Sequence, residues 1–352
     1  LPIGIALVVL GVVLGGVDIF LGFRNGTKPV AAILTAAIVL GVGLYLLPFP
    51  RLFSTLPSGC PPDCVRADLN GFDLSETTVP AADLLPGGPP KDGIPALTDP
   101  DFIAAEEVSF LEPNDRVLGV VANGVTKAYP LSIMTRHEIV NDTFDGRPVV
   151  VTYCPLCFAG MVFDARIEGR RQTFGVSGLL YNSDVVLYDR ETESLWSQLL
   201  QQAISGPRRG QALTLLHSTN TTWSDWRERH PGTLVLSDHT GFAVDYETDP
   251  YAGYDLSPGL LFPVQFQAMG YHPKEYVLGI VLDGIAKAYP VSELFKTGRP
   301  VIDDRIGNQD VRIRYDDYPV TAEIARADGS PLPGVMAYWF AWYAFHPETQ
   351  VY

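Results

Sequence analysis

The sequence is poor in basic residues. Lys and Arg together number 25 against 40 Asp and Glu, so the formal net charge of the 352 residues is −15. A protein that binds nucleic acid through its phosphates needs a basic surface, and this chain lacks the composition for one. Nucleic acid is therefore excluded as an expected partner, and the acidity suits a soluble surface that resists non-specific association.

Cysteine is also scarce. The four cysteines form two close pairs, Cys60/Cys64 in GCPPDCV and Cys154/Cys157 in VTYCPLCFAG. An even number with no leftover thiol fits two local disulfides in an oxidising compartment. For Cys60 and Cys64 a local disulfide is the prediction, and the alternative is the C-x-x-x-C spacing of some copper carriers.

Long apolar runs occur only near the start of the sequence. Residues 3–22 and 30–49 are almost wholly apolar, and each has about the ~20 residues that span a bilayer. Residues 1–50 are therefore predicted to form a transmembrane helical hairpin, with a helix near the membrane interface as the alternative. The link between the runs carries Arg24 and Lys28, which places it in the cytoplasm by the positive-inside rule. The expected localisation is the bacterial inner (cytoplasmic) membrane, with the soluble part on the periplasmic, extracytoplasmic side.

Amphipathic helical stretches are few in the rest of the chain. Residues 51–100 are rich in Pro and Gly and are predicted to form an extended arm. From residue 101, short apolar runs alternate with turn signals, such as Asn123-Gly124 in VLGVVANGVTKAYP, which predicts a tight hairpin. Further hairpins are expected at Gly146 and within 185–196, and helices within 221–230 and 337–346. These patterns indicate a mostly β (α+β) fold.

The sequence also repeats itself. VLGVVANGVTKAYP at 117 returns as VLGIVLDGIAKAYP at 277, and W-x-x-W-x-x-x-H-P-x-T-x-V occurs at both 223 and 339. We infer two related β-rich units, 101–240 and 260–352. Tyr129 lies 94 positions before Trp223, and Tyr289 lies 50 before Trp339, so the first unit is 44 residues longer. The extra residues are placed at about 154–200, starting at CPLC.

The CPLC sequence allows three kinds of chemistry. A C-x-x-C pair can exchange disulfides, but no helix or basic residue adjoins Cys154 and Cys157 to activate a thiolate. Together with His137 the pair offers ligands suited to Cu(I) or zinc, although zinc normally takes four ligands. A structural disulfide, or a buried pair that holds a tight turn, is the third alternative. His137 and the cysteines are the redox or metal candidates of this chain.

Other polar motifs are better explained by structure than by catalysis. The stretch GVSGLLYNSDVVLYDRETESLW (175–196) fits turn and packing chemistry, and its Ser177 lacks the flanking residues of a nucleophile elbow. His230 and His346 recur in both units, which argues for a shared structural role before Pro231 and Pro347. Since no spacing singles out an acid/base pair, the sequence assigns no catalytic residues and favours a non-enzymatic role.

With these residues in hand, the chain resembles a bacterial family of unknown function, domain of unknown function 3179 (DUF3179). The resemblance covers roughly residues 70–352. It implies an extracytoplasmic protein that is membrane-associated or exported, and it supplies no activity. The matching segments are VTYCPLCFAGMVFD, FGVSGLLYNSDVVLYDRETESLWSQ, TTWSDWRERHPGTLVLS and YWFAWYAFHPETQVY.

Two function classes follow from the sequence. In the first, the chain is a non-enzymatic accessory subunit of a larger membrane complex, such as a photosynthetic or respiratory one. Its partners would be the other subunits and the lipid bilayer. In the second, it is a thiol-disulfide or copper/zinc-handling protein that works through Cys154, Cys157 and His137.

Overall fold

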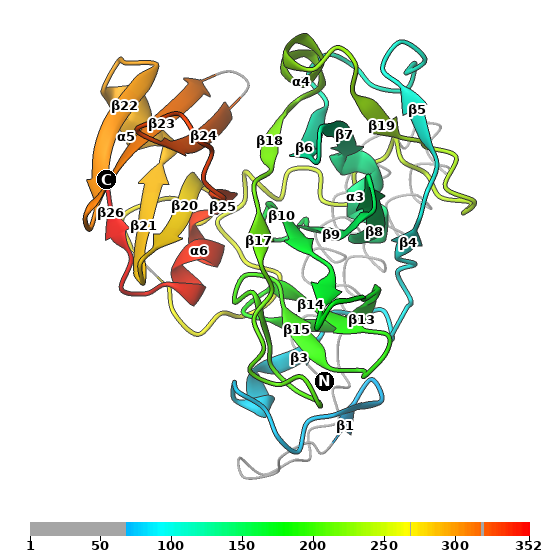
Figure 1. The fold of residues 1–352 in the computed structure, drawn as a ribbon. Coiled ribbons are helices and arrows are strands. Elements are labelled where there is room, and N and C mark those ends of the chain that lie inside the picture. The colour runs from blue at the N-terminus through cyan, green and yellow to red at the C-terminus, as the bar shows by residue number, and fades with distance from the viewer. Residues whose placement is uncertain (1–67, 268, 318–319) are drawn as a thin grey trace, which may run out of the picture. The chain divides into compact units, whose positions relative to one another are not determined.

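The computed structural model describes residues 68–267, 269–317 and 320–352 (Figure 1). These residues are mostly β-strand. The α-helices among them are short, with six or seven residues each, and no described helix is long and apolar enough to cross a membrane. The helices are α3 (Leu131–His137), α4 (Trp223–Arg229), α5 (Val291–Lys296) and α6 (Trp339–Phe345), with a 3-10 turn at Ala81–Asp83.

The predicted fold class, two β-rich units behind a transmembrane hairpin, is wrong. The described residues form five sheets of three to five strands, in a propeller-like arrangement of five blades, and two further two-stranded sheets. The predicted hairpin, residues 1–50, and the Cys60/Cys64 pair lie outside the described residues. The small sheets are β1 (Asp68–Leu69) with β2 (Phe72–Asp73), and β11 (Arg166–Ile167) with β12 (Arg170–Arg171).

Two of the five sheets are built on the repeated hairpin sequence. Asn123 and Gly124 have φ angles of 49° and 75°, and Asp283 and Gly284 have 50° and 79°, as a tight two-residue turn requires. The predicted hairpins at 117–130 and 277–290 are therefore confirmed. The strand order of the first sheet is β18 (Thr219–Thr222), β6 (Arg116–Ala122), β7 (Val125–Pro130), β19 (Leu234–Leu236), β5 (Phe102–Ala104); that of the second is β25 (Val335–Tyr338), β20 (Tyr276–Leu282), β21 (Ile285–Pro290), β26 (Gln350–Val351).

The repeated tryptophan motif fastens a short helix to each of these sheets. The Trp226 indole donates to Thr233 Oγ1 at 3.0 Å, and Trp342 donates to Thr349 Oγ1 at 2.9 Å. His230 and His346 cap the C-termini of α4 and α6, with ring centroids 4.1 Å from those of Trp226 and Trp342. The structural role predicted for both histidines is confirmed.

Stability should depend on pH through His346. Burial lowers the pKa of this imidazole to about 4, whereas a histidine in an unfolded chain has a pKa near about 6.5. Between these values the unfolded chain binds the extra proton, so the free energy of unfolding falls as pH is lowered from about 6.5 to about 4. A His346→Gln variant, compared with the wild type by thermal unfolding across this range, should lose part of that decline. Equal slopes for both proteins would contradict the assignment.

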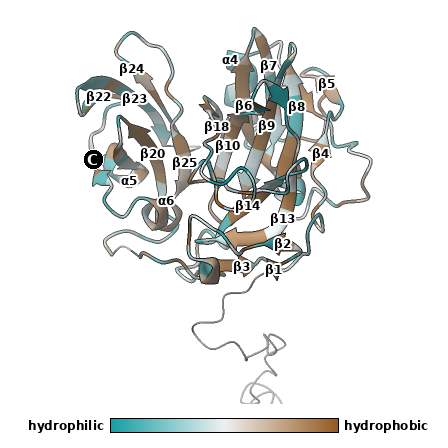
Figure 2. Cartoon of the chain, turned by 60° about the horizontal axis from the view of Figure 1, so that its bottom comes forward, coloured by the Kyte–Doolittle hydropathy of each residue, from teal (hydrophilic) through white to brown (hydrophobic). Residues whose placement is uncertain are grey.

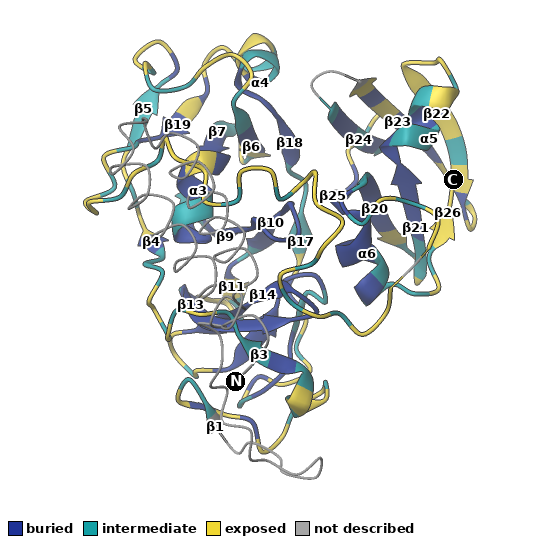
Figure 3. Ribbon diagram, turned by 180° about the vertical axis from the view of Figure 1, so that it is seen from behind, coloured by how far each residue is buried: buried dark blue, intermediate teal, exposed yellow. Residues whose placement is uncertain are grey.

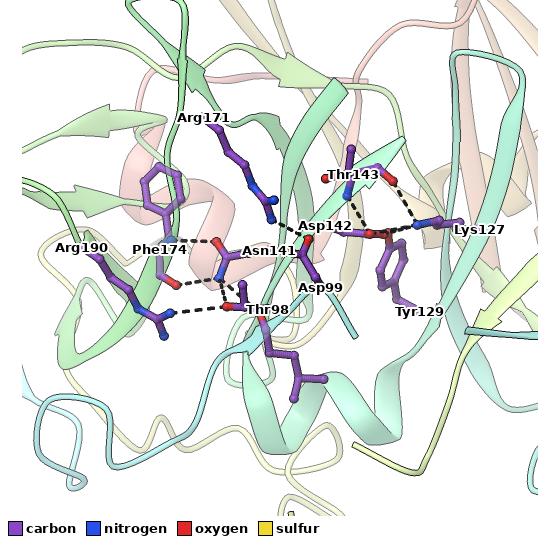
Figure 4. Close-up of polar contacts among 11 residues, drawn as sticks. Thr98, Asp99, Lys127, Tyr129, Asn141, Asp142, Thr143, Arg171, Phe174 and Arg190 are labelled. Atoms are coloured by element: carbon purple, nitrogen blue, oxygen red, sulfur yellow. Dashed lines mark hydrogen bonds and ion pairs between the residues drawn. The ribbon is translucent and has the colours of Figure 1, made fainter. Parts of the chain in front are cut away.

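Two further sheets follow the repeated hairpins in the chain, and each is held by a Lys–Asp–Tyr contact. Figure 4 shows the first of these contacts, at Asp142. Lys127 Nζ lies 2.7 Å from Asp142 Oδ2, which also accepts from the Tyr129 hydroxyl at 2.6 Å. Lys287 and Tyr289 donate to Asp304 in the same way. The strand orders are β17 (Leu215–Leu216), β10 (Ala159–Asp164), β9 (Arg147–Cys154), β8 (Ile139–Phe144), β4 (Leu97–Thr98), and β22 (Val301–Ile306), β23 (Gln309–Asp317), β24 (Val320–Arg326).

Each repeated hairpin begins a series of strands, β6 to β19 in the first series and β20 to β26 in the second. The fifth sheet has no counterpart in the second series. Every residue of its two longest strands, β13 and β14, is buried (Figure 3). Its apolar residues contribute to the brown interior in Figure 2, as do those of β9 and β10. The strand order is β16 (Gln202–Ala203), β15 (Leu195–Ser197), β14 (Asp184–Asp189), β13 (Phe174–Tyr181), β3 (Leu84–Pro86).

Candidate functional site

The CPLC sequence forms the turn between strands β9 and β10. Cys154 ends β9 and pairs with Ala159, the first residue of β10. The Cys157 amide donates to the Cys154 carbonyl at 3.2 Å, and Phe158 has a φ angle of 55°. Both thiols are free and fully buried. A strand, not a helix, follows CPLC, as the sequence indicated, and the turn directs both cysteines into the protein.

A second turn, between β13 and β14, meets the two cysteines from the neighbouring sheet. Asn182 and Ser183 both have positive φ angles, 51° and 64°, so the chain reverses tightly at this point. The carbonyl of Ser183 accepts from Cys157 Sγ at 3.4 Å and from Cys154 Sγ at 3.7 Å. Two turns that are distant in sequence thus bring sulfur and oxygen atoms together inside the protein.

Asp184 completes this group of potential ligands. Its carboxylate and the two sulfur atoms all lie within 4.8 Å of one another, and all three residues are buried. Asp184 Oδ2 accepts from the Leu199 amide at 2.9 Å, whereas Oδ1 is buried with no hydrogen-bond partner among the described residues. A buried carboxylate oxygen without a partner is unfavourable. Cys154, Cys157 and Asp184 are called the thiol–carboxylate cluster below.

Burial makes the ionised forms of these groups unfavourable. It raises the pKa of Cys154, raises that of Cys157 well above its ordinary value, and raises that of Asp184 to about 7. Since a thiol attacks a disulfide as its thiolate, the raised pKa values argue against fast disulfide exchange. Among the described residues, no positive charge is paired with the cluster to stabilise its anionic forms.

Glu138 is a fourth buried acid close to the cluster. Burial and the nearby Asp184 carboxylate raise its pKa to about 8. Its backbone has a φ of 57° and a ψ of −32°, an unusual conformation for a residue with a side chain, and its carbonyl accepts from the Tyr153 amide at 2.8 Å. Neither Glu138 nor Asp184 forms an ion pair with any described Lys, Arg or His. Four acidic groups are therefore buried near one another without a counter-ion among the described residues.

His137 does not join the two cysteines in the cluster. Its Nδ1 lies 2.7 Å from the carbonyl oxygen of Pro95, and its Nε2 lies 2.6 Å from the Tyr246 hydroxyl. Both ring nitrogens therefore have partners from other segments of the chain, and Asp184 takes the third position that the sequence suggested for His137.

Sequence reasoning missed Asp184 and Glu138. Asp184 belongs to the polar stretch 175–196, which the sequence assigned to turns and packing, and the turn at 182–183 agrees with that assignment. Ser177 is also structural, because its hydroxyl donates to the Val186 carbonyl and accepts from the Leu179 amide. The only local signal for Asp184 is that Asn182-Ser183-Asp184 interrupts two apolar strands with three polar residues.

The thiol–carboxylate cluster has the composition of a metal site with an open position. Zinc accepts thiolate and carboxylate ligands, and a site with three protein ligands leaves its fourth position for water or a substrate. Zn–S bonds of about 2.3 Å separate two thiolates by about 3.8 Å in a tetrahedral site. One ligand atom from each of the three residues lies within 4.8 Å of the other two, which is close to this sulfur–sulfur spacing. A bound cation would also neutralise the buried acids.

Comparison with known proteins gives a family and no function. Neither curated proteins nor solved structures give a significant match to this chain. The model of a protein family of unknown function, DUF3179, matches residues 91–329, which is more than half of the chain. The matched region includes both turns of the thiol–carboxylate cluster. The chain therefore belongs to the DUF3179 family.

Proposed function

We propose that this protein binds a metal ion at Cys154, Cys157 and Asp184, and that zinc is the ion that suits these ligands best. The observation that carries the proposal is the burial of two thiols and one carboxylate within 4.8 Å of one another. Acidic groups without a counter-ion are rarely buried together. Their charged forms lose the hydration of water, and their neutral forms leave polar atoms without hydrogen-bond partners. A divalent cation removes this cost by binding the deprotonated forms.

The donor set favours zinc over the other chemistries suggested by the sequence. Two thiolates alone suit Cu(I), but a carboxylate is a hard ligand that adds little to Cu(I) binding, and zinc takes both types. Disulfide exchange needs an accessible thiolate of low pKa, whereas both thiols here are buried and have raised pKa values. Copper(I) binding remains the competing metal hypothesis.

The accessory-subunit hypothesis stays a prediction. It rests on the apolar residues 1–50, on the Pro/Gly-rich residues 51–100 and on the lack of a catalytic set in the sequence. Residues 1–67 lie outside the described part of the chain. Metal binding at the cluster is compatible with such a role, because the cluster is buried and leaves the outer surface free for a partner.

An Asp184→Asn variant should bind zinc at least about ten times more weakly than the wild type, because it replaces a charged ligand with a neutral amide. The measurement is a competition titration of the intact, metal-free, reduced chain with Zn²⁺ and a chromophoric chelator. The wild type should bind one equivalent of zinc through this cluster.

Asp189→Asn is the matched control for this titration. Asp189 lies at the other end of β14 and, like Asp184, is 0 % exposed. Its carboxylate is occupied by Thr192 and Trp196, so its loss perturbs the same strand without removing a proposed ligand. Equal zinc affinities for the two variants would contradict the proposed site.

A further inference from the structure

A cavity of about 890 Å³ lies on the outer side of the CPLC turn. Tyr153, Pro155 and Phe158 line it, whereas Cys154 and Cys157 are directed to the buried cluster. The second series of strands forms one wall of the cavity, which Tyr338 lines. The Tyr338 amide donates to the Cys157 carbonyl at 2.8 Å. One turn therefore separates the cavity from the thiol–carboxylate cluster.

The inner part of the cavity combines one guanidinium with three tyrosines. Arg116 lies with its Cζ 5.6 Å from the Phe158 ring centroid, and burial lowers the pKa of the guanidinium. Its Nη2 donates to the Val320 carbonyl, but its Nη1 is buried with no partner among the described residues. The rings of Tyr153, Tyr276 and Tyr338 line this end beside Arg116. The ring centroids of Tyr276 and Tyr338 are 5.4 Å apart. This inner end is called the arginine–tyrosine pole.

The mouth of the cavity has the opposite charge. Seven carboxylates line the cavity; the five that belong to exposed residues mark its mouth, and those of Asp115 and Asp238 are half-buried. Arg116 is the only Lys or Arg among the described lining residues. Two of the five belong to turns whose amides they cap: Asp245 accepts from Glu247, and Asp249 accepts from Tyr251. The five carboxylates are those of Glu112, Asp245, Glu247, Asp249 and Asp255.

We propose that the cavity binds a small zwitterion of the amino-acid class, with its carboxylate at the arginine–tyrosine pole and its ammonium group toward the acidic mouth. A ligand carboxylate would meet the Arg116 charge and the phenol hydroxyls, which are the donors that recognise carboxylates in proteins. The ammonium group would face the carboxylates at the mouth, and an apolar side chain would pack on the tyrosine rings.

The two poles together select against ligands with a single charge. A simple anion meets seven lining carboxylates against one guanidinium, and repulsion at the mouth lowers its local concentration. A simple cation is attracted to the mouth but leaves Arg116 without a partner at the inner end. A zwitterion satisfies both ends at once. The inference is independent of the proposed metal site, since none of the three proposed ligands lines the cavity.

Three ligands that share a phenyl ring and differ in their charged groups test this proposal. Isothermal titration of the intact chain with L-phenylalanine should show one site. 3-Phenylpropionate, which lacks the ammonium group, and phenethylamine, which lacks the carboxylate, should each bind at least about tenfold more weakly, since each loses one of the two charged contacts. The Arg116→Met variant should reduce phenylalanine affinity by a similar factor and leave phenethylamine affinity unchanged.

Two further variants separate binding from folding. Tyr276→Phe keeps the ring and removes only the hydroxyl, so it should weaken phenylalanine binding in a folded protein. Arg227→Met removes one positive charge from α4, outside this cavity, and should have no effect. The proposal is overturned if phenylalanine does not bind, if phenethylamine binds equally well, or if Arg116→Met and Tyr276→Phe leave the affinity unchanged.

Discussion

An Asp142→Asn variant is expected to lose about 3–5 kcal/mol of its free energy of unfolding, because the substitution leaves a buried ammonium group without its partner. The side chains of Lys127 and Asp142 are only 9 % and 6 % exposed. Lys127 Nζ contacts both carboxylate oxygens, at 2.9 Å and 2.7 Å, and Tyr129 donates to the same group. Urea unfolding followed by tryptophan fluorescence measures the loss.

The second series of strands supplies a matched control for this prediction. Asp304 makes the same contacts with Lys287 and Tyr289, but its side chain is 19 % exposed. Asp304→Asn should therefore cost less than Asp142→Asn, since water compensates part of the lost interaction. A loss below about 1 kcal/mol for Asp142→Asn would show that the pair behaves like a surface ion pair. That result would contradict the stabilising role assigned to this buried contact.

The double variant Cys154→Ser/Cys157→Ser is expected to bind zinc at least about 100-fold more weakly than the wild type. Loss of a residue that only supports a ligand costs about 10–100-fold in affinity, and here two ligands are removed. Free zinc at 100 times its dissociation constant should stabilise the wild type by about 2.7 kcal/mol. The double variant should gain no such stabilisation. Chemical unfolding with and without zinc measures both effects.

The same experiment separates a metal site from a disulfide. If Cys154 and Cys157 formed a structural disulfide, a reductant would destabilise the wild type by about 2–5 kcal/mol, and zinc would have no effect on the oxidised protein. If they bind zinc, a mild reductant has no effect on the loaded protein, and a chelator destabilises it. A wild type that responds to the reductant and ignores zinc would contradict the metal proposal.

Local structure was predictable because its signals are local. Asn123-Gly124 and Asp283-Gly284 fix their hairpins through the positive φ angles that these residues accept. The W-x-x-W-x-x-x-H-P-x-T motif encodes contacts within eleven residues, so its repetition indicated a shared structure. The Lys–Asp–Tyr contacts also explain why KAYP recurs at 127 and 287.

The sheets themselves were not predictable, because their neighbours are distant in sequence. Residues 84–86, assigned to an extended arm, form β3 and pair with β13, which lies almost a hundred positions later. The first series has extra strands, β11 to β17, which begin after β10. CPLC lies before them, in the turn between β9 and β10, and these two strands correspond to β23 and β24 of the second series. Alternation of apolar residues identifies strands and does not identify their partners.

The site was predictable only in part for the same reason. CPLC is visible because its two cysteines are only three positions apart in the sequence, whereas the third member, Asp184, is brought to them by a different hairpin. His137 seemed the natural third ligand from its residue type, yet its ring is held by Pro95 and Tyr246. Burial, which raises the pKa values of Asp184 and Glu138, is a property of the tertiary structure alone.

The most direct test of the central claim is an X-ray absorption spectrum at the zinc edge. The intact, reduced chain is loaded with one equivalent of Zn²⁺ and freed of excess metal. The proposed site predicts two sulfur neighbours at about 2.3 Å, with oxygen in the remaining positions. Loss of the zinc during removal of the excess, or a spectrum with only oxygen and nitrogen neighbours, would contradict a metal site at Cys154, Cys157 and Asp184.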